Sequence, residues 1–394
     1  MRVNGKLWVR RVQNMKLLKT ATQLLSAVAM VASTMAYAVD GVSTDKIVIG
    51  QSITLQAGKN DYGNAVQAGV QTYLKSVNSH GGVNGRQIVL KTLDDDNKTD
   101  KAEANAQQLV EKDKVFMLFG SIEGGPSTAV MKVANKLSVP FFGPMAGSPT
   151  LRRPFQPLVY PVRAEHREEF KALIAQARNL GMGKVAFLRS DSEVGAQHLA
   201  NVKLICAELG AELVADLPFK GDINQAQIDK LVQQTEQAGA QVVLNHGSSG
   251  VYEAFIRKSR AKGVRVTFYG VNSGSSQLVK HLGELAHGMV FSQVVPSPWE
   301  RKTRITREYQ DELTKAKPGE EFSYGSLEGY ITAKALVMAL RLAGQNPTRE
   351  GFVTALDGAR LDLNGLKVSY GSDLHQGLGF VDLAIVTRES KFRH

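Results

Sequence analysis

The feature that most constrains this fold is an alternation of short β-branched runs with amphipathic runs, which starts at Lys46 and occurs in two series. The strand-like runs of the first series are KIVIGQSI, RQIVLKTLDDD, KVFMLFG and VPFFGP. The stretch after the first run carries an apolar stripe at helical spacing, made of Val66, Val70, Tyr73, Leu74 and Val77. Such an order predicts a parallel sheet with helices on both faces.

A second series of the same kind follows. Its strand-like runs are KVAFLRS, ELVADLPF, AQVVLNHG, VTFYGVN and GMVFSQVV, with helical stretches between them. The series are joined near residues 162–165 and again near 293–298. Helices over 305–315, 327–343 and 349–356, with short strands LKVSY and FVDLAIV, complete the chain. We predict an α/β fold with two doubly wound parallel-sheet lobes.

The first 38 residues have a different character. They hold six basic residues and no acid, then an apolar run over 24–35 that ends in Ala36-Tyr37-Ala38. This order is typical of a cleaved secretory signal peptide, and the run is too short to span a bilayer. We expect a signal peptide over residues 1–38, with Met1 or Met15 as the start. No cysteine follows it, so we expect export to a periplasm without a lipid anchor.

The charge argues against a nucleic-acid-binding protein, and the cysteine content argues against a disulfide-bonded one. The net charge of +11 falls to +5 once the six basic residues of the N-terminal segment are removed. This charge is mild and interspersed with acids, so we expect no nucleic-acid partner. Cys206 is the single cysteine, which rules out a disulfide within the chain; it lies in a helix-like stretch and is expected to be buried.

Motifs for catalysis and for cofactors are missing. LFGSIEGGPSTAV, over 118–130, has P-loop spacing between Gly120 and Gly125, but Pro126 stands where the motif requires a lysine, so no charge reaches the phosphates of a nucleotide. There is no G-x-S-x-G turn, and the eight histidines show no metal-ligand spacing. The run Asp94–Asp96 is interpreted as a solvated strand end rather than a cation site. We expect no enzyme, no cofactor and no bound metal.

The same loops favour ligand binding. Ligands of parallel α/β sheets bind outside the carboxyl ends of the strands, where these Gly- and Ser-rich segments gather. The segment at 118–130 precedes a helix expected to start at Ser127, so backbone N–H groups from Gly124 to Thr128 suit a carboxylate or another anion. The alternative is that Ser127 or Thr128 is a plain N-cap that satisfies those donors itself.

Four stretches carry a resemblance to a known family: IVIGQSITLQAGKNDYGNAVQAGVQTYLKSVNSHGGVNGRQIVLKTLDDD, VFMLFGSIEGGPSTAV, VPFFGPMAGSPTLR and GMVFSQVVPSPW. With them the chain resembles the type I periplasmic solute-binding proteins of branched-chain-amino-acid-type ABC transporters, the leucine-binding-protein family. The resemblance covers essentially all of the mature chain. It implies two lobes joined by three hinge crossovers, which close over a solute. We place the N-terminal lobe at 45–163 plus 296–375 and the C-terminal lobe at 164–295 plus 376–394.

The resemblance also implies binding positions. Tyr62 keeps the family's aromatic residue after the first strand, and Gly124 stands where the family has a serine that grips a carboxylate. The other candidate positions in these loops are Glu123, Gly125, Ser127, Met145, Ala146, Gly147, Ser148, Glu193, Val194, Ser248 and Asn272. A buried ammonium needs a charged acceptor, and Asn272 is neutral. Glu123 or Glu193 is the candidate replacement, and the departures argue against leucine as the solute.

These observations predict a monomeric, non-catalytic receptor that captures an amino acid or a related small organic solute for the permease subunits of an ABC importer. The alternative is a sensing module that docks on a signalling partner in the periplasm. Arg163, at the first crossover, is either an anion contact or part of a hinge salt bridge. Tyr324 either lines the cleft or packs in the core, and Trp299 is expected to be structural.

Overall fold

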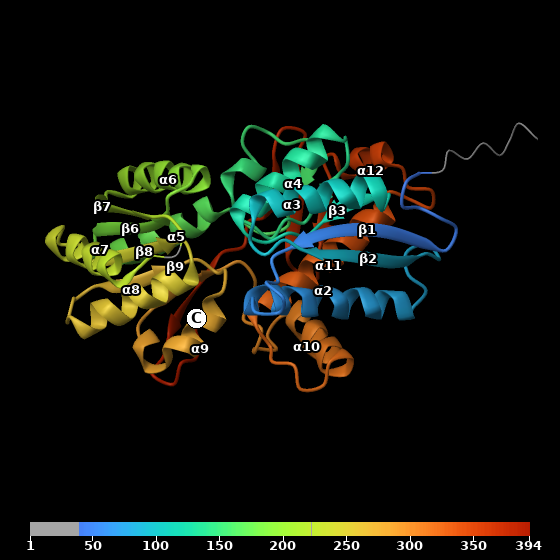
Figure 1. Ribbon diagram of the computed structural model, residues 1–394. Helices are drawn as coiled ribbons and strands as arrows, with labels where there is room; N and C mark the ends of the chain where they lie inside the picture. Colours follow the sequence, from blue (N-terminus) through green and yellow to red (C-terminus); the bar gives the residue numbers. More distant parts are fainter. Residues whose placement is uncertain (1–38, 222) are drawn as a thin grey trace, which may run out of the picture. The chain divides into compact units, whose positions relative to one another are not determined.

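The computed structural model describes residues 39–221 and 223–394, so the expected signal peptide lies outside the described residues. Residues 40–394 group into one unit of mutual contacts. None of the helices in the described part combines the length and the apolar character needed to cross a bilayer. The strands form three sheets, and Figure 1 labels the elements in chain order.

The first series forms a parallel sheet of five strands in the order β2-β1-β3-β4-β5. The strands are β1 (Lys46–Ile53), β2 (Gln87–Asp94), β3 (Met117–Phe119), β4 (Phe141–Phe142) and β5 (Val159–Tyr160). The helices of this series are α2 (Asp61–Ser79), α3 (Thr99–Gln107) and α4 (Gly124–Lys136). The βαβ pattern predicted from the sequence is confirmed.

Helix α2 follows from its local sequence. Asn60 caps it, because its side chain accepts a hydrogen bond of 2.7 Å from the N–H of Gly63. The predicted stripe of apolar residues is buried along one face, as Val66, Val70, Tyr73, Leu74 and Val77. Burial of such a stripe holds an amphipathic helix on its sheet.

The second series forms a sheet of seven strands in the order β15-β14-β10-β9-β8-β6-β7. Its parallel strands are β6 (Lys184–Ser190), β7 (Glu212–Phe219), β8 (Val242–His246), β9 (Thr267–Gly270) and β10 (Val290–Gln293). Strands β14 (Asp382–Val386) and β15 (Phe392–Arg393) run antiparallel at one edge. The helices are α5 (His166–Asn179), α6 (Glu193–Leu209), α7 (Gln225–Gln237), α8 (Ser249–Ala261) and α9 (Ser275–Leu282).

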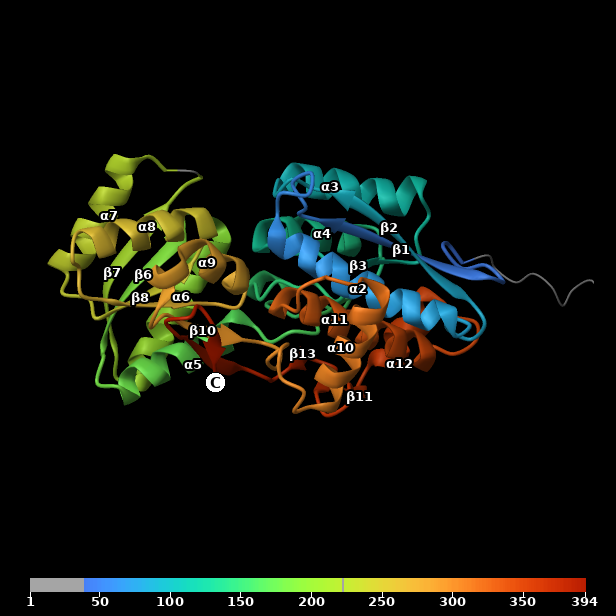
Figure 2. The same ribbon diagram turned by 90° about the horizontal axis from the view of Figure 1, so that it is seen from below.

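After β10 the chain returns to the first sheet. The three helices of this part are α10 (Arg304–Ala316), α11 (Tyr324–Leu342) and α12 (Arg349–Leu356). Helices α10 and α11 pack against α2, and both views show these helices side by side (Figure 1, Figure 2). A small sheet of β11 (Arg360–Asp362), β12 (Lys367–Tyr370) and β13 (His375–Leu378) follows. The chain then joins the second sheet through β14, while the lobe boundaries stay a prediction.

Glycines let α2 and α11 approach closely. A Cβ atom at Gly69 of α2 would lie 1.8 Å from the carbonyl oxygen of Ser326 in α11. A Cβ atom at Gly329 of α11 would lie 2.2 Å from the carbonyl oxygen of Val66 in α2. Neither position has room for a side chain, because the nearest atoms belong to backbone.

Candidate functional site

The helix after β3 starts earlier than the sequence suggests. Helix α4 begins at Gly124 rather than Ser127, and Glu123 precedes it in a left-handed conformation with φ of 65°. The N–H of Ser127 donates to the carbonyl oxygen of Glu123 at 3.1 Å, so it belongs to the helix. No side chain caps this end. The expected row of free N–H groups from Gly124 to Thr128 is therefore wrong, and it shortens to Gly124 and Gly125.

The side chain of Ser127 is hydrogen-bonded inside the protein. It is fully buried, and its Oγ lies 2.6 Å from Oγ of Ser121. The next hydroxyl in the helix, Thr128 Oγ1, donates to the carbonyl oxygen of Gly124 at 2.7 Å. The structure shows neither residue as a plain N-cap of α4.

Gly124 lies where three of the predicted loops meet. A Cβ atom built on it would be 3.2 Å from Cγ1 of Val194 and 3.7 Å from Cβ of Ser148. Gly124 and Ser148 follow strands of the first sheet, whereas Val194 is in α6 after β6 of the second sheet. The Ser148 hydroxyl is 2.8 Å from Oγ1 of Thr150. Three of the positions named from the sequence, Gly124, Ser148 and Val194, therefore lie close together in the structure.

The two acids proposed as replacements lie beside this meeting point. Glu123 directly precedes Gly124 and is partly exposed. Burial raises the pKa of Glu123, and the charge of Asp95 raises it further. Glu193 is exposed at the start of α6, next to Val194. Both stay candidates for contact with a solute.

The segment from Met145 to Ser148, which includes Ala146 and Gly147, is buried and held at both ends. The N–H of Met145 donates to the carbonyl oxygen of Ser121 at 2.7 Å. The carbonyl oxygen of Gly147 accepts from the N–H of His166 at 2.9 Å, at the first residue of α5. A Cβ atom at Gly147 would lie 2.6 Å from Cγ of His166, so only glycine fits here.

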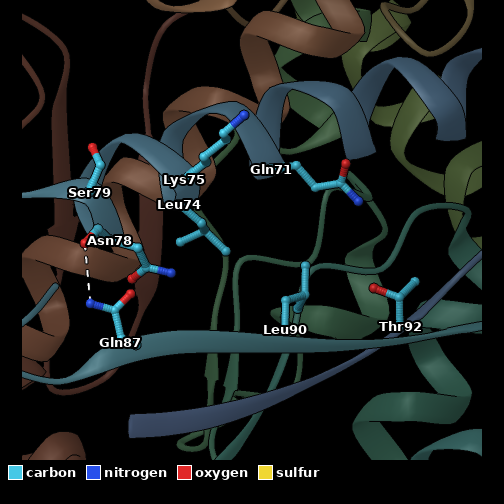
Figure 3. A pocket seen from close by; sticks show the side chains of 8 residues that line it. All are labelled: Gln71, Leu74, Lys75, Asn78, Ser79, Gln87, Leu90 and Thr92. Atoms are coloured by element: carbon cyan, nitrogen blue, oxygen red, sulfur yellow. Dashed lines mark hydrogen bonds between the residues drawn. The ribbon is translucent and has the colours of Figure 1, made fainter. Parts of the chain in front are cut away.

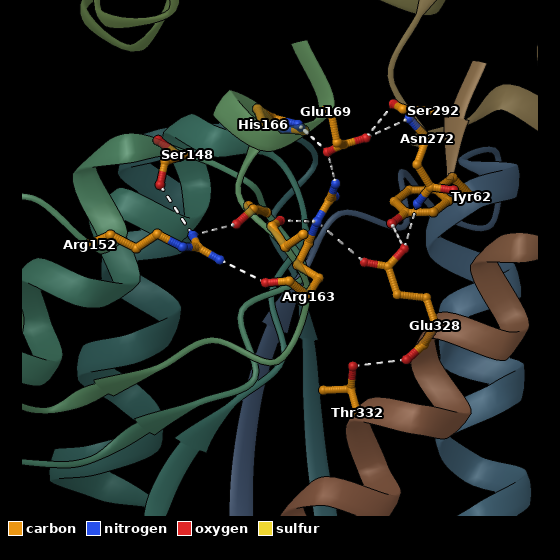
Figure 4. Close-up of polar contacts among 12 residues, drawn as sticks. Tyr62, Ser148, Arg152, Arg163, His166, Glu169, Asn272, Ser292, Glu328 and Thr332 are labelled. Carbon is orange, nitrogen blue, oxygen red and sulfur yellow. Dashed lines mark hydrogen bonds and ion pairs between the residues drawn. The ribbon is translucent and has the colours of Figure 1, made fainter. Parts of the chain in front are cut away.

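Tyr62 and Asn272 meet on a buried acid that sequence reasoning missed. The Tyr62 hydroxyl donates to Oε2 of Glu328 at 2.9 Å, and Nδ2 of Asn272 donates to the same oxygen at 2.7 Å (Figure 4). Burial raises the pKa of Glu328, and the nearby Arg163 opposes that rise. Burial and the charge of Glu328 raise the pKa of Tyr62, which keeps its hydroxyl a donor.

Arg163 is bound by carboxylates of the protein. Its Nη2 contacts Oε1 of Glu169 in α5, and its Nε lies 3.8 Å from Oε1 of Glu328 in α11. Oε2 of Glu169 also accepts from the N–H of Asn272 at 3.1 Å and from Oγ of Ser292 at 2.7 Å. The salt-bridge interpretation of Arg163 is confirmed, and Figure 4 shows it linking both acids.

One signal in the sequence points to Glu328. It is an acid within YGSLEGYITAKALVMALRL, a helix with buried residues along nearly its whole length. A buried acid needs a charged or hydrogen-bonding partner, so such an acid marks a polar contact. The sequence does not say which partner it meets, because Tyr62 is 266 positions away.

The remaining residues named from the sequence, Ser248, Tyr324 and Trp299, lie outside this network of buried charges. Ser248 is exposed at the start of α8 and makes no side-chain cap. Tyr324 is buried in the core, and its hydroxyl is 2.9 Å from Nε2 of His394. Trp299 stacks on Phe392 with ring centroids 5.7 Å apart, in agreement with a structural role.

The acidic run after β2 is not a solvated strand end throughout. Asp95 is fully buried and accepts from Oγ1 of Thr54 at 2.6 Å and from Oγ of Ser52 at 3.2 Å. Asp94 accepts from the backbone N–H groups of residues 55–57 and of Asp96. The run therefore shapes the loop that leads to Tyr62.

A pocket of about 550 Å³ lies between α2 and β2 (Figure 3). Its lining includes Gln71, Leu74, Asn78, Gln87 and Leu90. None of the positions implied by the resemblance is in it. We therefore place the candidate site at the loops around Gly124, where residues of the two sheets meet.

Comparison with known proteins agrees with the fold. The sequence model of the family described as "Periplasmic binding protein" matches residues 46–388. A Leu/Ile/Val-binding protein homolog 7 of Brucella abortus is 27% identical over 297 residues, which cover 69% of this chain and 71% of the relative. Homolog 1 of the same organism is 24% identical over 334 residues, covering 83% and 86%.

Solved structures share the architecture. A possible leucine/isoleucine/valine-binding protein from Rhodopirellula baltica superposes with a TM-score of 0.81 at 22% identity, covering 91% of this chain and 98% of that one. The leucine-binding protein LivK from Thermotoga maritima gives a TM-score of 0.74 at 18% identity, covering 88% and 98%. A solute-binding protein from R. palustris in complex with benzoate gives 0.76 at 15% identity, covering 88% and 95%.

The family match spans most of the chain, and the two-sheet fold with its crossovers agrees with it. The chain therefore belongs to the type I periplasmic binding proteins, in the leucine-binding-protein family.

Proposed function

We propose that this protein is the solute-binding component of an ABC importer, which captures a small organic solute between two lobes and presents it to the permease. The family is one of substrate-binding proteins rather than enzymes. One observation carries the proposal: Gly124 and Ser148, after strands of the first sheet, lie beside Val194 of the second. Solutes of α/β sheets bind at such strand ends.

The start of α4 favours a carboxylate on the solute. The N–H groups of Gly124 and Gly125 lack intrahelical acceptors and stand at the positive end of the helix dipole. An anion at such an end needs no charged side chain. The relatives are named for leucine-type amino acids and benzoate, and a carboxylate is common to these ligands. We propose a small organic carboxylate, with an amino acid as one member of that class.

The proposed cellular role follows the family. It supports an extracytoplasmic location, and we propose a periplasmic monomer whose segment 1–38 is removed after export. The lobes proposed are 45–163 plus 296–375 and 164–295 plus 376–394. Closure around a solute stabilises the closed form only if that form binds it better than the open one.

A thermal-shift screen of the purified mature chain tests the proposal. The panel holds branched-chain amino acids, aromatic and aliphatic carboxylates and the corresponding amides. A solute at 100 times its Kd adds about 2.7 kcal/mol to stability. We expect carboxylates to raise Tm and amides to fail, because the amide brings no charge to the start of α4.

A matched pair of variants locates the site. Gly124→Val places a branched side chain against Val194 and Ser148, so it should abolish the shift of the best carboxylate. Gly250→Val is the control, because nothing but Oγ of Ser248 lies within 4 Å of a Cβ atom there. A panel without any hit would contradict solute binding, whereas a full shift in Gly124→Val would contradict this location.

A further inference from the structure

Three histidines that are far apart in the sequence lie together. His166 is the first residue of α5, His198 lies within α6, and His246 ends β8. One ring nitrogen from each forms a group whose members all lie within 4.8 Å of one another, among the residues that the structure describes. The ring centroids are 3.9 Å apart for His198 and His246 and 4.4 Å apart for His166 and His246.

Three of the six ring nitrogens in this histidine cluster are buried without a partner. Both ring nitrogens of His198 and Nδ1 of His246 are buried without a hydrogen bond to any described residue. An unsatisfied buried polar group destabilises the folded state, and native structures keep few of them. Three such atoms in one cluster indicate that the folded protein satisfies them with something else, namely water or an ion.

Glu169 fixes the tautomer of His166. Nδ1 of His166 is 2.8 Å from Oε1 of Glu169, which also binds Arg163. A carboxylate is an acceptor, so Nδ1 of His166 carries the proton and Nε2 carries the lone pair. Metal-binding histidines show the same arrangement, with a carboxylate behind one nitrogen and the metal at the other.

We propose that His166, His198 and His246 bind a divalent transition-metal ion of the Zn²⁺ class, with Glu169 positioning His166. Three imidazoles suit Zn²⁺, with water in the fourth position. Nitrogens on one tetrahedral Zn²⁺ lie about 3.4 Å apart, given Zn–N bonds of about 2.1 Å. The nitrogens, which lie up to 4.8 Å apart, must therefore approach by as much as about 1.4 Å, and no hydrogen bond to a described residue holds His198 back.

The surroundings fit a bound cation. Phe170 packs against the three rings as an apolar wall. Figure 4 shows the Glu169 carboxylate between His166 and the positive Arg163. His246 is only partly buried, which gives an ion access from its side.

The test uses the mature chain without an affinity tag, stripped with a chelator. Zn²⁺ is titrated in by calorimetry, and Co²⁺ is added as a spectroscopic substitute. We expect one equivalent of Zn²⁺ per chain, a rise in Tm, and the absorption of tetrahedral Co²⁺ with nitrogen ligands. This test is independent of the solute screen, because it needs no solute and no transport.

Two ligand variants and one control decide the matter. His198→Leu removes a ring that has no other polar contact, so the chain should fold and bind Zn²⁺ at least about 100-fold more weakly. His246→Gln should weaken binding in the same way. His287→Gln is the control, because His287 is exposed, and it should titrate as the unmodified chain does. If the chain takes up no Zn²⁺, or if His198→Leu binds it unchanged, the three histidines are a packed cluster and the proposal is overturned.

Discussion

At the scale of single residues, Arg163 is the position whose charge the fold requires most strictly. Its side chain is 1% exposed and lies between Glu169 of α5 and Glu328 of α11. Burial lowers the pKa of Arg163, but the charges of Glu169 and Glu328 raise it above its ordinary value. Arg163 therefore stays charged between two acids that have almost no contact with water.

Removal of that charge is expected to destabilise the protein strongly. Arg163→Met leaves both carboxylates buried without their counter-ion, and breaking a buried ion pair costs about 3–5 kcal/mol. Arg301→Met is the control, because Arg301 pairs with Asp311 at the surface, where the two side chains are 50% and 66% exposed. An exposed pair contributes about 0–1 kcal/mol. Urea unfolding measures both, and equal losses would contradict the role given to Arg163.

A second residue-scale prediction concerns acid. Burial raises the pKa of Asp94, but four backbone N–H groups outweigh it and lower the pKa from 3.8 to about 2. A group with a lowered pKa stabilises the fold above its unfolded pKa, and this stability is lost as pH falls from about 4 to about 2. Asp94→Asn should therefore lose stability less steeply than the unmodified chain in that window. Urea midpoints across it test this, and parallel curves would contradict it.

The residues of the candidate site could be predicted in part. Tyr62, Gly124 and Ser148 follow strands of a parallel sheet, and that rule alone places them at one edge. Glu169 and Glu328 sit inside helices, where the sequence gives burial but not the facing partner. The three histidines come from two helices and a strand end, so their spacing along the chain does not predict that they lie together.

At the scale of elements, the packing of α2 on α11 depends on glycine. Gly69→Ala should destabilise the protein by about 1–3 kcal/mol, as overpacking does, because its Cβ would meet the backbone of Ser326 at 1.8 Å. The same change at Gly250, in the first turn of α8, meets no backbone atom and should stabilise slightly, by less than the roughly 0.5–1 kcal/mol of a mid-helix position. Urea unfolding measures both signs. A stabilised Gly69→Ala variant would contradict the close approach.

The long elements were predictable, whereas several of the short strands were not. Five apolar residues at helical spacing predict helix α2, and all five are buried on one face of it. Strands β5, β11, β13 and β15 have four residues or fewer and escaped prediction, because pairing with neighbours fixes them rather than a local pattern. The start of α4 was misplaced because Gly124 and Gly125 have low helix propensity, which the helix overcomes through its buried face.

At the scale of the whole molecule, contacts across distant parts of the chain hold the two sheets' elements together. Asn272, which follows β9 of the second sheet, donates to Glu328 of α11, which packs on the first. η3 (Pro149–Leu151), which follows β4, packs against α6. Movement between the proposed lobes must break such contacts, and the free energy of solute binding must favour remaking them.

A crosslink tests this movement directly. Cβ at Gly124 would lie 3.2 Å from Cγ1 of Val194, and the sulfur of a cysteine at 194 can take the place of that Cγ1, within reach of a disulfide to residue 124. The double variant Gly124→Cys with Val194→Cys should therefore oxidise to one internal disulfide, and buried Cys206 should not compete. Unlike the branched valine of the screening variant, cysteine adds a single sulfur atom beyond Cβ, directed at residue 194, so solute bound before oxidation should stay through gel filtration and leave after reduction. Each single-cysteine variant, the control, should release it. A double variant that oxidises yet exchanges solute freely would show that closure at Gly124 does not govern access.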